Sequence, residues 1–131
     1  ATPVCSSTRA SIMSGKHGSK TGVFGVPGNL DTSHISVLRM LASKTNDAYT
    51  KAVVGKWHIS MPTNPNHPGM HGADFYTGFM DGFPADYSLW QQTTNGVTIT
   101  NTDYVTSVFT DSAISWTQKQ TKPPANDPHE T

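Results

Sequence analysis

The stretch TKAVVGKWHI, residues 50–59, decides the fold of this chain. Its centre, Ala52 to Val54, is a short β-branched apolar run, which is typical of a strand buried on both faces of a parallel sheet. Before it we expect a helix with Ser33 as its N-cap, because apolar side chains recur there at three- and four-residue spacing. These side chains are Ile35, Leu38, Leu41 and Ala42. A helix followed by such a strand is half of a βαβ unit, so the sequence predicts an α/β fold.

The rest of the chain predicts two further helices and one hairpin. Residues 5–15 favour a short helix that ends at Gly15, and residues 103–118 return to helical spacing. Residues 95–101 begin with Asn-Gly, the pair typical of a tight hairpin turn. Residues 61–82 are dense in Pro, Gly, His and Asn but also carry aromatic residues, which predicts a long ordered loop with a function.

The composition limits the classes of protein to which the chain can belong. With 131 residues, 34% of them hydrophobic, it has the size and apolar content of one globular domain. Zero net charge and the lack of a basic cluster argue against a nucleic-acid partner. A single cysteine excludes an internal disulfide, and no apolar run has the length of a membrane span.

The first residues, ATPVC, lack both an initial Met and a signal-peptide pattern. We therefore expect the sequence to be a fragment or a trimmed product. These first residues do not determine the cellular compartment. A composition rich in Thr, Asn and Ser and poor in charge favours a periplasmic or secreted protein.

Cys5 and Arg9 form the first candidate site. Four positions apart on a helix, they share one face about one turn apart. The first turn of that helix also directs unpaired N–H groups and the positive end of its dipole to the same place. Such a site favours an anion, whether a thiolate, a sulfate or a phosphate. The alternative is that Cys5 is a small buried hydrophobic residue and Arg9 a surface cation.

Lys56 and His58 form the second candidate site, at the end of the expected strand. Two positions apart in an extended chain, they point to the same side, toward the crevice where open α/β sheets bind ligands. Lys56 can neutralise an anion, and His58 can move a proton near neutral pH. The alternative is a solvated Lys56 and a His58 that is hydrogen-bonded in a turn.

Four segments resemble the type I, formylglycine-dependent sulfatases, arylsulfatase-like members of the alkaline phosphatase superfamily. PVCSSTRASIMSGK, residues 3–16, is similar to their first signature, a cysteine in a C-x-P/A-x-R context that begins a helix. GKWHIS, residues 55–60, resembles their second signature. NHPGMHGADFYTGFMDG, residues 66–82, and DYVTSVFTDSAISW, residues 103–116, resemble two supporting segments. The order of the segments also fits, and together they cover nearly the whole chain.

The resemblance implies a mixed, mostly parallel sheet flanked by helices, present here only in part. Residues 1–131 would be part of a sulfatase catalytic domain that lacks the first strand and the C-terminal portion. Such a piece exposes apolar sheet edges, so we expect the isolated chain to be inactive and to aggregate or partly unfold.

The resemblance also implies a role for each candidate residue. In the family the cysteine is oxidised to formylglycine, whose hydrated aldehyde attacks the sulfate ester, and Cys5 is the matching position. Arg9 matches the arginine that holds the formylglycine, Lys56 the lysine that contacts the sulfate, and His58 the histidine that takes the diol proton. A calcium ion, with magnesium as the alternative, lies beneath the nucleophile. Of its ligands, only the converted Cys5 falls within these residues.

Two positions depart from the family pattern. The segment NDPHET resembles the family's N-x-P-H-x-P segment, which makes His129 a candidate acid for the leaving alcohol. An apolar strand normally precedes that segment, whereas residues 122–124 here are Lys-Pro-Pro. Ser7 occupies the position where the commonest formylglycine-generating enzymes prefer Pro or Ala. Conversion of Cys5 therefore depends on a maturation enzyme that accepts Ser7.

The favoured hypothesis is a sulfuric ester hydrolase that acts on a sulfated small molecule or glycan, either a carbohydrate or an aryl sulfate. Its second partner would be a formylglycine-generating or anaerobic maturation enzyme. One alternative keeps the fold but hydrolyses phosphonate monoesters or phosphodiesters. The other is a non-catalytic fragment that binds a glycan through residues 61–83.

Overall fold

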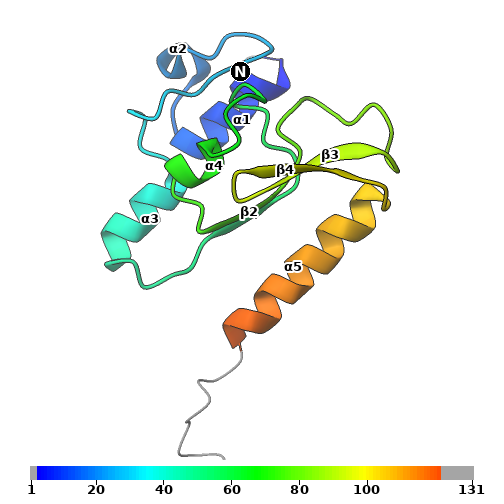
Figure 1. Ribbon diagram of the computed structural model, residues 1–131. Coiled ribbons are helices and arrows are strands. Elements are labelled where there is room, and N and C mark those ends of the chain that lie inside the picture. Colours follow the sequence, from blue (N-terminus) through cyan, green and yellow to red (C-terminus); the bar gives the residue numbers. More distant parts are fainter. Residues whose placement is uncertain (1–2, 122–131) are drawn as a thin grey trace, which may run out of the picture.

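A computed structural model of the protein describes residues 3–121. Three helices come first in this part of the chain, followed by strands with one short helix between the first two, and a long helix comes last (Figure 1). In order they are α1 (Cys5–Ser14), α2 (Gly18–Thr21), α3 (Val37–Thr45), β1 (Ala52–Val54), α4 (His67–Met70), β2 (Phe75–Gly78), β3 (Trp90–Thr94), β4 (Val97–Asn101) and α5 (Val105–Thr121). The α/β fold predicted from the sequence is confirmed.

One four-stranded sheet, with the order β1-β2-β3-β4, forms the centre of the fold. β1 pairs parallel to β2, with Val53 opposite Tyr76. β2 pairs antiparallel to β3, and β3 pairs antiparallel to β4. The sheet is mixed, as expected. Within residues 3–121 its parallel part is limited to the β1–β2 pair, because the chain after β2 returns through a hairpin and not through further crossovers.

Helices cover both faces of the sheet (Figure 1). On one face Val53 of β1 and Tyr76 of β2 pack with α1 around a core that also contains Ala10, Leu30 and Trp57. On the other face α5 contacts β1 and β2, and Phe109 of α5 stacks on Phe79 and meets the edge of Trp90. Burial of these aromatic and aliphatic groups is the main term that holds the layers together.

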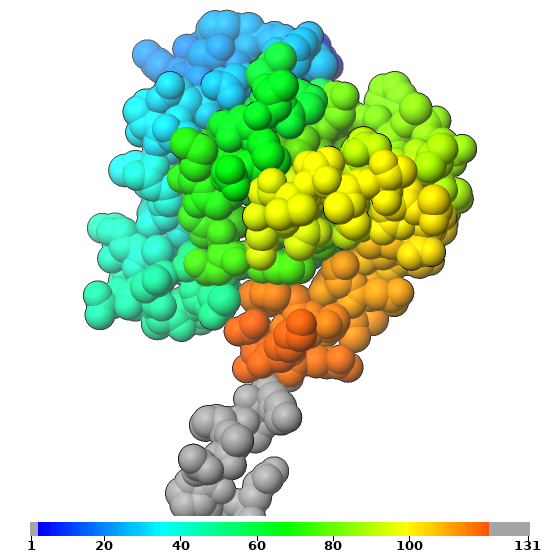
Figure 2. Space-filling model, viewed as in Figure 1, coloured from blue at the N-terminus to red at the C-terminus, as the bar shows by residue number. Residues whose placement is uncertain are grey.

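In the space-filling view the β3–β4 hairpin of the sheet faces the viewer, and α5 extends below it (Figure 2). No helix within residues 3–121 is both long and apolar enough to cross a membrane.

The first helix and the hairpin follow the sequence prediction closely. α1 ends at Ser14, and Gly15 adopts a left-handed conformation (φ 66°), the C-cap geometry that favours glycine. At the hairpin turn Asn95 and Gly96 have φ values of 46° and 87°, as a tight turn between antiparallel strands requires.

The structure corrects two expectations about the middle of the chain. α3 begins at Val37, and its N-cap is Ser36, whose hydroxyl accepts a hydrogen bond from the backbone N–H of Arg39 at 3.1 Å. Ser33 instead lies in a turn and donates its N–H to Asp31 Oδ1. Residues 61–82 are not one long loop, since they contain α4 and β2. Both elements have only four residues, too few for a periodic pattern to identify.

Candidate active site

Cys5 is the first residue of α1, and the backbone before it sets its position. Val4 is extended (φ −129°, ψ 145°) and its side chain makes no capping hydrogen bond. The positive end of the α1 dipole therefore lies at Cys5 without a side-chain cap. Ser6, Ser7 and Ala10 are fully buried and hold the helix against the core, whereas Cys5 is exposed. The alternative of a buried, inert Cys5 is wrong.

His58 is positioned by the backbone that follows β1. Gly55, Trp57 and His58 donate their N–H groups to Thr77, Phe79 and Met80 at 2.8, 3.0 and 3.1 Å. Through these bonds, the segment after β1 stays hydrogen-bonded to β2 and to the residues that follow β2. Within this segment His58 has a left-handed backbone (φ 54°), which is uncommon for a residue with a side chain and often marks a functional site.

The two candidate sites meet at one contact. The sulfur of Cys5 lies 3.1 Å from Nδ1 of His58, and the hydroxyl of Ser6 lies 3.5 Å from the same nitrogen. His58 is only 3% exposed. Its burial, and then the positive charge of Lys56, lower the pKa of the imidazole, while Asp81 opposes this shift. A neutral imidazole next to Cys5 is suited to accept a proton from a group at that position.

Arg9 connects α1 to the segment that carries Lys56 and His58. Its Nε donates to the backbone oxygen of Trp57 at 2.7 Å, and its Nη2 donates to the backbone oxygen of Lys56. Burial lowers the pKa of the guanidinium, but arginine remains charged in proteins. Arg9 is therefore a partly buried bridge between the two candidate sites, and the alternative of an isolated surface cation is wrong.

Cys5, Lys56 and His58 line one pocket of about 330 Å³, together with Val26, Asp81, Gly82 and Phe83. The sequence prediction named three of these residues as site residues. It placed the segment 81–83 in a functional loop, but assigned it no contact with His58. A Cβ added at Gly82 would lie 3.3 Å from Cε1 and Nε2 of His58, so a residue without a side chain lets this segment pack against the imidazole. Asp81-Gly82 is a turn-forming pair, but nothing in the sequence relates it to His58.

Not every predicted site feature falls within the described residues. His129, the candidate acid, lies outside them. Within residues 3–121 there is no group of three or more His, Cys, Asp or Glu side chains that could hold a metal ion. The contribution of Cys5 to a metal site therefore stays a prediction from the resemblance.

Comparisons with known proteins give the site its context. No family model matches the chain. It is 31% identical over 94 residues to the steryl-sulfatase of Homo sapiens and 33% identical over 87 residues to the arylsulfatase G of Mus musculus. Each match covers 60% of this chain but only 16% and 15% of the relative. The chain thus spans about one sixth of the length of the curated relatives it matches.

Solved structures share the fold over almost the whole chain. The structure of Ps i-CgsB in complex with k-i-k-neocarrahexaose matches with a TM-score of 0.73 and 23% identity, over 93% of this chain and 32% of that one. The structure of BT4656 in complex with its substrate, D-glucosamine-2-N,6-O-disulfate, matches with a TM-score of 0.68 and 21% identity, over 97% and 23%. In sequence the chain has a distant, partial similarity to steryl-sulfatase and arylsulfatase G, and its fold matches a part of the Ps i-CgsB and BT4656 structures.

Proposed function

We propose that the intact protein hydrolyses a sulfate ester of a small molecule or glycan, with Cys5, converted to formylglycine, as its nucleophile. The observation that carries this proposal is the 3.1 Å contact between Cys5 Sγ and His58 Nδ1 at the uncapped start of α1. The distant similarity to steryl-sulfatase and arylsulfatase G supports the reaction class. Residues 1–131 would then form part of the catalytic domain.

The chemistry requires more than a plain thiol. A hydrated aldehyde carries two hydroxyl groups on one carbon, so one can take the sulfuryl group from the ester while the other, on losing its proton, expels sulfate and restores the aldehyde. Conversion of the Cys5 thiol to the aldehyde is an oxidation, which a separate maturation enzyme must supply.

The chain's own residues can serve both halves of this reaction. Nδ1 of His58 is close enough to the Cys5 side chain to take a proton from a hydroxyl at that position. Lys56 lines the same pocket and can offset the negative charge of the sulfuryl oxygens. Arg9 fixes the distance between Cys5 and His58 through its two bonds to the Trp57 and Lys56 carbonyls.

The metal predicted from the resemblance does not fit the described residues alone. Cys5 and Asp81 line one pocket, but no cluster of three metal-binding side chains occurs within residues 3–121. We therefore assign no step to a metal ion. A divalent cation, calcium or magnesium, remains a prediction from the resemblance, and oxygen ligands would suit either ion.

The test combines turnover with mass spectrometry. We expect the intact protein, purified with Ca²⁺, to release inorganic sulfate from 4-nitrophenyl sulfate, and we expect Cys5→Ala to abolish this release. We also expect the peptide that contains Cys5 to carry the mass of formylglycine. Bis(4-nitrophenyl) phosphate serves as the second substrate, because faster turnover of this diester would favour the phosphodiesterase alternative. Lack of turnover of any sulfated substrate, together with an unmodified Cys5, would refute the proposal.

A further inference from the structure

A second pocket adjoins the Cys5 pocket and has no role in the chemistry described so far. It has a volume of about 370 Å³ and shares two residues, Asp81 and Phe83, with the Cys5 pocket. Gly82, between these two residues, packs against the imidazole of His58. Residues of the segment 81–83 therefore line both pockets. A ligand that has its anionic group beside Cys5 can extend past this segment toward the second pocket.

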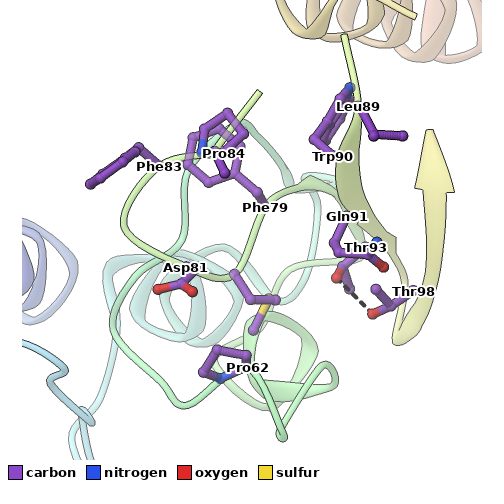
Figure 3. A pocket seen from close by; sticks show the side chains of 12 residues that line it. Pro62, Phe79, Asp81, Phe83, Pro84, Leu89, Trp90, Gln91, Thr93 and Thr98 are labelled. Carbon is purple, nitrogen blue, oxygen red and sulfur yellow. Dashed lines mark hydrogen bonds between the residues drawn. The ribbon is translucent and has the colours of Figure 1, made fainter. Parts of the chain in front are cut away.

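Aromatic and aliphatic side chains form much of the second pocket (Figure 3). Phe79 and Pro84 lie on one side of it, and Trp90 and Leu89 on another. Trp90 is only 3% exposed, its Nε1 donates to the Asp103 carbonyl at 2.9 Å, and its ring meets that of Phe79 edge to face. Because Trp90 is fixed in this way, the apolar wall exists before any ligand binds, which lowers the entropic cost of binding.

Polar groups lie on two sides of the pocket. On the strand side Thr93 and Thr98 point their hydroxyls at one another at 2.8 Å, as the dashed line in Figure 3 marks, and Gln91 lies above them. Asp81 lies on the side away from the strands, where one carboxylate oxygen accepts the N–H of Gly82 at 2.7 Å. Of the described residues that line this pocket, Asp81 is the only charged one.

The combination of apolar walls, hydroxyl and amide groups and one carboxylate favours one chemical class of ligand. A sugar ring has an apolar C–H face that suits aromatic and aliphatic walls, and hydroxyl groups that suit carboxylate, amide and hydroxyl partners. A second sulfate on the same ring would meet the negative charge of Asp81 with no cation in the lining of the pocket. The Cys5 pocket, in contrast, contains Lys56.

We propose that this second pocket binds the neutral, hydroxyl-bearing sugar ring of a monosulfated substrate, and that Asp81 discriminates against a second anionic group on that ring. The assignment rests on the proposed function for the position of the sulfate. It goes further in that it selects a monosulfated carbohydrate among the sulfate esters, and makes Asp81 a specificity-determining residue.

Binding alone tests the inference, independently of turnover. The intact protein is titrated with unsulfated methyl β-D-galactopyranoside, its 6-sulfate and its 4,6-disulfate, and the affinities are measured by NMR. We expect the unsulfated glycoside to shift the resonances of Trp90 and Leu89. We expect Leu89→Ala to weaken its binding by about threefold to tenfold, because the substitution removes apolar contact area. Val97 is 65% exposed on the same hairpin and does not line the pocket, so Val97→Ala is the matched control and should leave binding unchanged.

The discrimination by Asp81 is measured as a ratio of dissociation constants. We expect the disulfate to bind about tenfold more weakly than the monosulfate, and Asp81→Asn to reduce this ratio to below about threefold. An effect of Asp81→Asn on the Cys5 pocket cancels in the ratio, because both ligands have a sulfate there. Absence of shifts at Trp90 and Leu89, or an unchanged ratio in Asp81→Asn, would overturn the inference. Absence of sulfate release in the turnover assay would instead overturn only the proposed function.

Discussion

The sulfur of Cys5 lies 3.1 Å from Nδ1 of His58, although 53 positions separate the two residues in the chain. Three separate features produce this contact. The start of α1 places Cys5 at the surface, the backbone pairing after β1 places His58, and Arg9 joins the two segments. A change in any one of them is therefore expected to disturb the site without a change in the reacting groups.

The first prediction concerns His58 itself. We expect His58→Asn to lower kcat for sulfate release by about 10²-fold to 10⁴-fold, because the proton acceptor is lost. Asparagine tolerates the left-handed backbone at this position (φ 54°), so the melting temperature should change little.

The pH profile of activity gives a second measurement of the role of His58. The lowered pKa of His58 keeps the imidazole neutral above that pKa, so activity should persist into mildly acidic pH and fall only as pH drops through it. An acid limb that is unchanged in His58→Asn would contradict this assignment.

The second prediction concerns Ser7, the position that departs from the maturation motif. Ser7 is fully buried in the first turn of α1, and within the described residues its hydroxyl has no hydrogen-bond partner. Ser7→Ala should therefore stabilise the protein by about 1 kcal/mol, because an unpaired buried hydroxyl is removed. It should also raise the fraction of Cys5 converted to formylglycine, measured by mass spectrometry after co-expression with a maturation enzyme. Ser14→Ala is the control. It removes a hydroxyl that is bonded to the Ala10 carbonyl at 2.7 Å, and should give neither gain.

The third prediction tests the contact between the segment 81–83 and His58. A methyl group at Gly82 would lie 3.3 Å from the imidazole, so Gly82→Ala should displace the ring and reduce kcat by about tenfold. The expected loss of stability is small, because the φ of Gly82 does not lie in the left-handed region. Gly69→Ala introduces the same methyl group where no atom lies within 4 Å, and should leave kcat unchanged. Equal kcat values for the two variants would show that the contact has no catalytic effect.

The fourth prediction concerns acid stability and a histidine that is remote from the chemistry. Nδ1 of His67 accepts the Trp57 indole N–H at 3.0 Å, and its Nε2 lies 2.9 Å from the Leu30 carbonyl. Burial, and then the neighbouring His71, lower the pKa of His67 from 6.5 to about 4. Between these values the unfolded chain binds more protons than the folded one, so the stability is fully present above pH 6.5 and decreases as pH falls toward 4.

The size of this effect is measurable by urea unfolding across the same pH range. We expect a loss of about 2 kcal/mol from His67, somewhat less than the full shift implies because solvent screens part of it. His67→Gln should lower stability at neutral pH but also flatten the pH dependence. If the slope of His67→Gln equals that of the unmodified protein, another group is responsible for the acid sensitivity.

The sequence predicts a larger part of the candidate site than of the fold around it. Cys5 and Arg9 could be paired because both lie on α1, where helical spacing fixes which residues share a face. Lys56 and His58 were paired by strand-like spacing, although both lie after the end of β1. The contact between the two pairs depends on packing of α1 against the segment after β1. No local pattern encodes that packing, and only the family resemblance indicated it.

The same distinction explains what the sequence did not predict. α4 and β2 are held by tertiary contacts, namely the buried His67 and Tyr76 side chains and the pairing of β2 with β1, and four residues carry no periodicity of their own. The N-cap of α3 was assigned to Ser33 instead of Ser36 because Ser33 precedes Ile35, the first residue of the apolar repeat, whereas Ser36 follows it. Ser36 is selected by a contact from outside the helix, since its hydroxyl also bonds to the His71 carbonyl.

The last prediction separates the charge of Arg9 from its geometry. Arg9→Lys keeps a cation near Cys5, but a single ammonium group cannot reproduce the planar fork that reaches the carbonyls of both Trp57 and Lys56. If the charge alone matters, the kcat of Arg9→Lys should be close to that of the unmodified protein. If Arg9 instead fixes the distance between Cys5 and His58, kcat should fall by about 10²-fold, because a misplacement of about 1 Å at the reacting groups has that effect.

Because the bridge acts on geometry and not on sulfate affinity, the KM for 4-nitrophenyl sulfate should change far less than kcat. A buried carbonyl that loses its partner also reduces stability by about 1 to 3 kcal/mol, so the melting temperature of Arg9→Lys should fall. Arg39→Lys is a matched control on α3. Its Nη1 donates to the Thr32 carbonyl at an exposed site, and the substitution should alter neither kcat nor KM. An Arg9→Lys variant that raises KM and leaves kcat intact would instead assign Arg9 to direct contact with the sulfate.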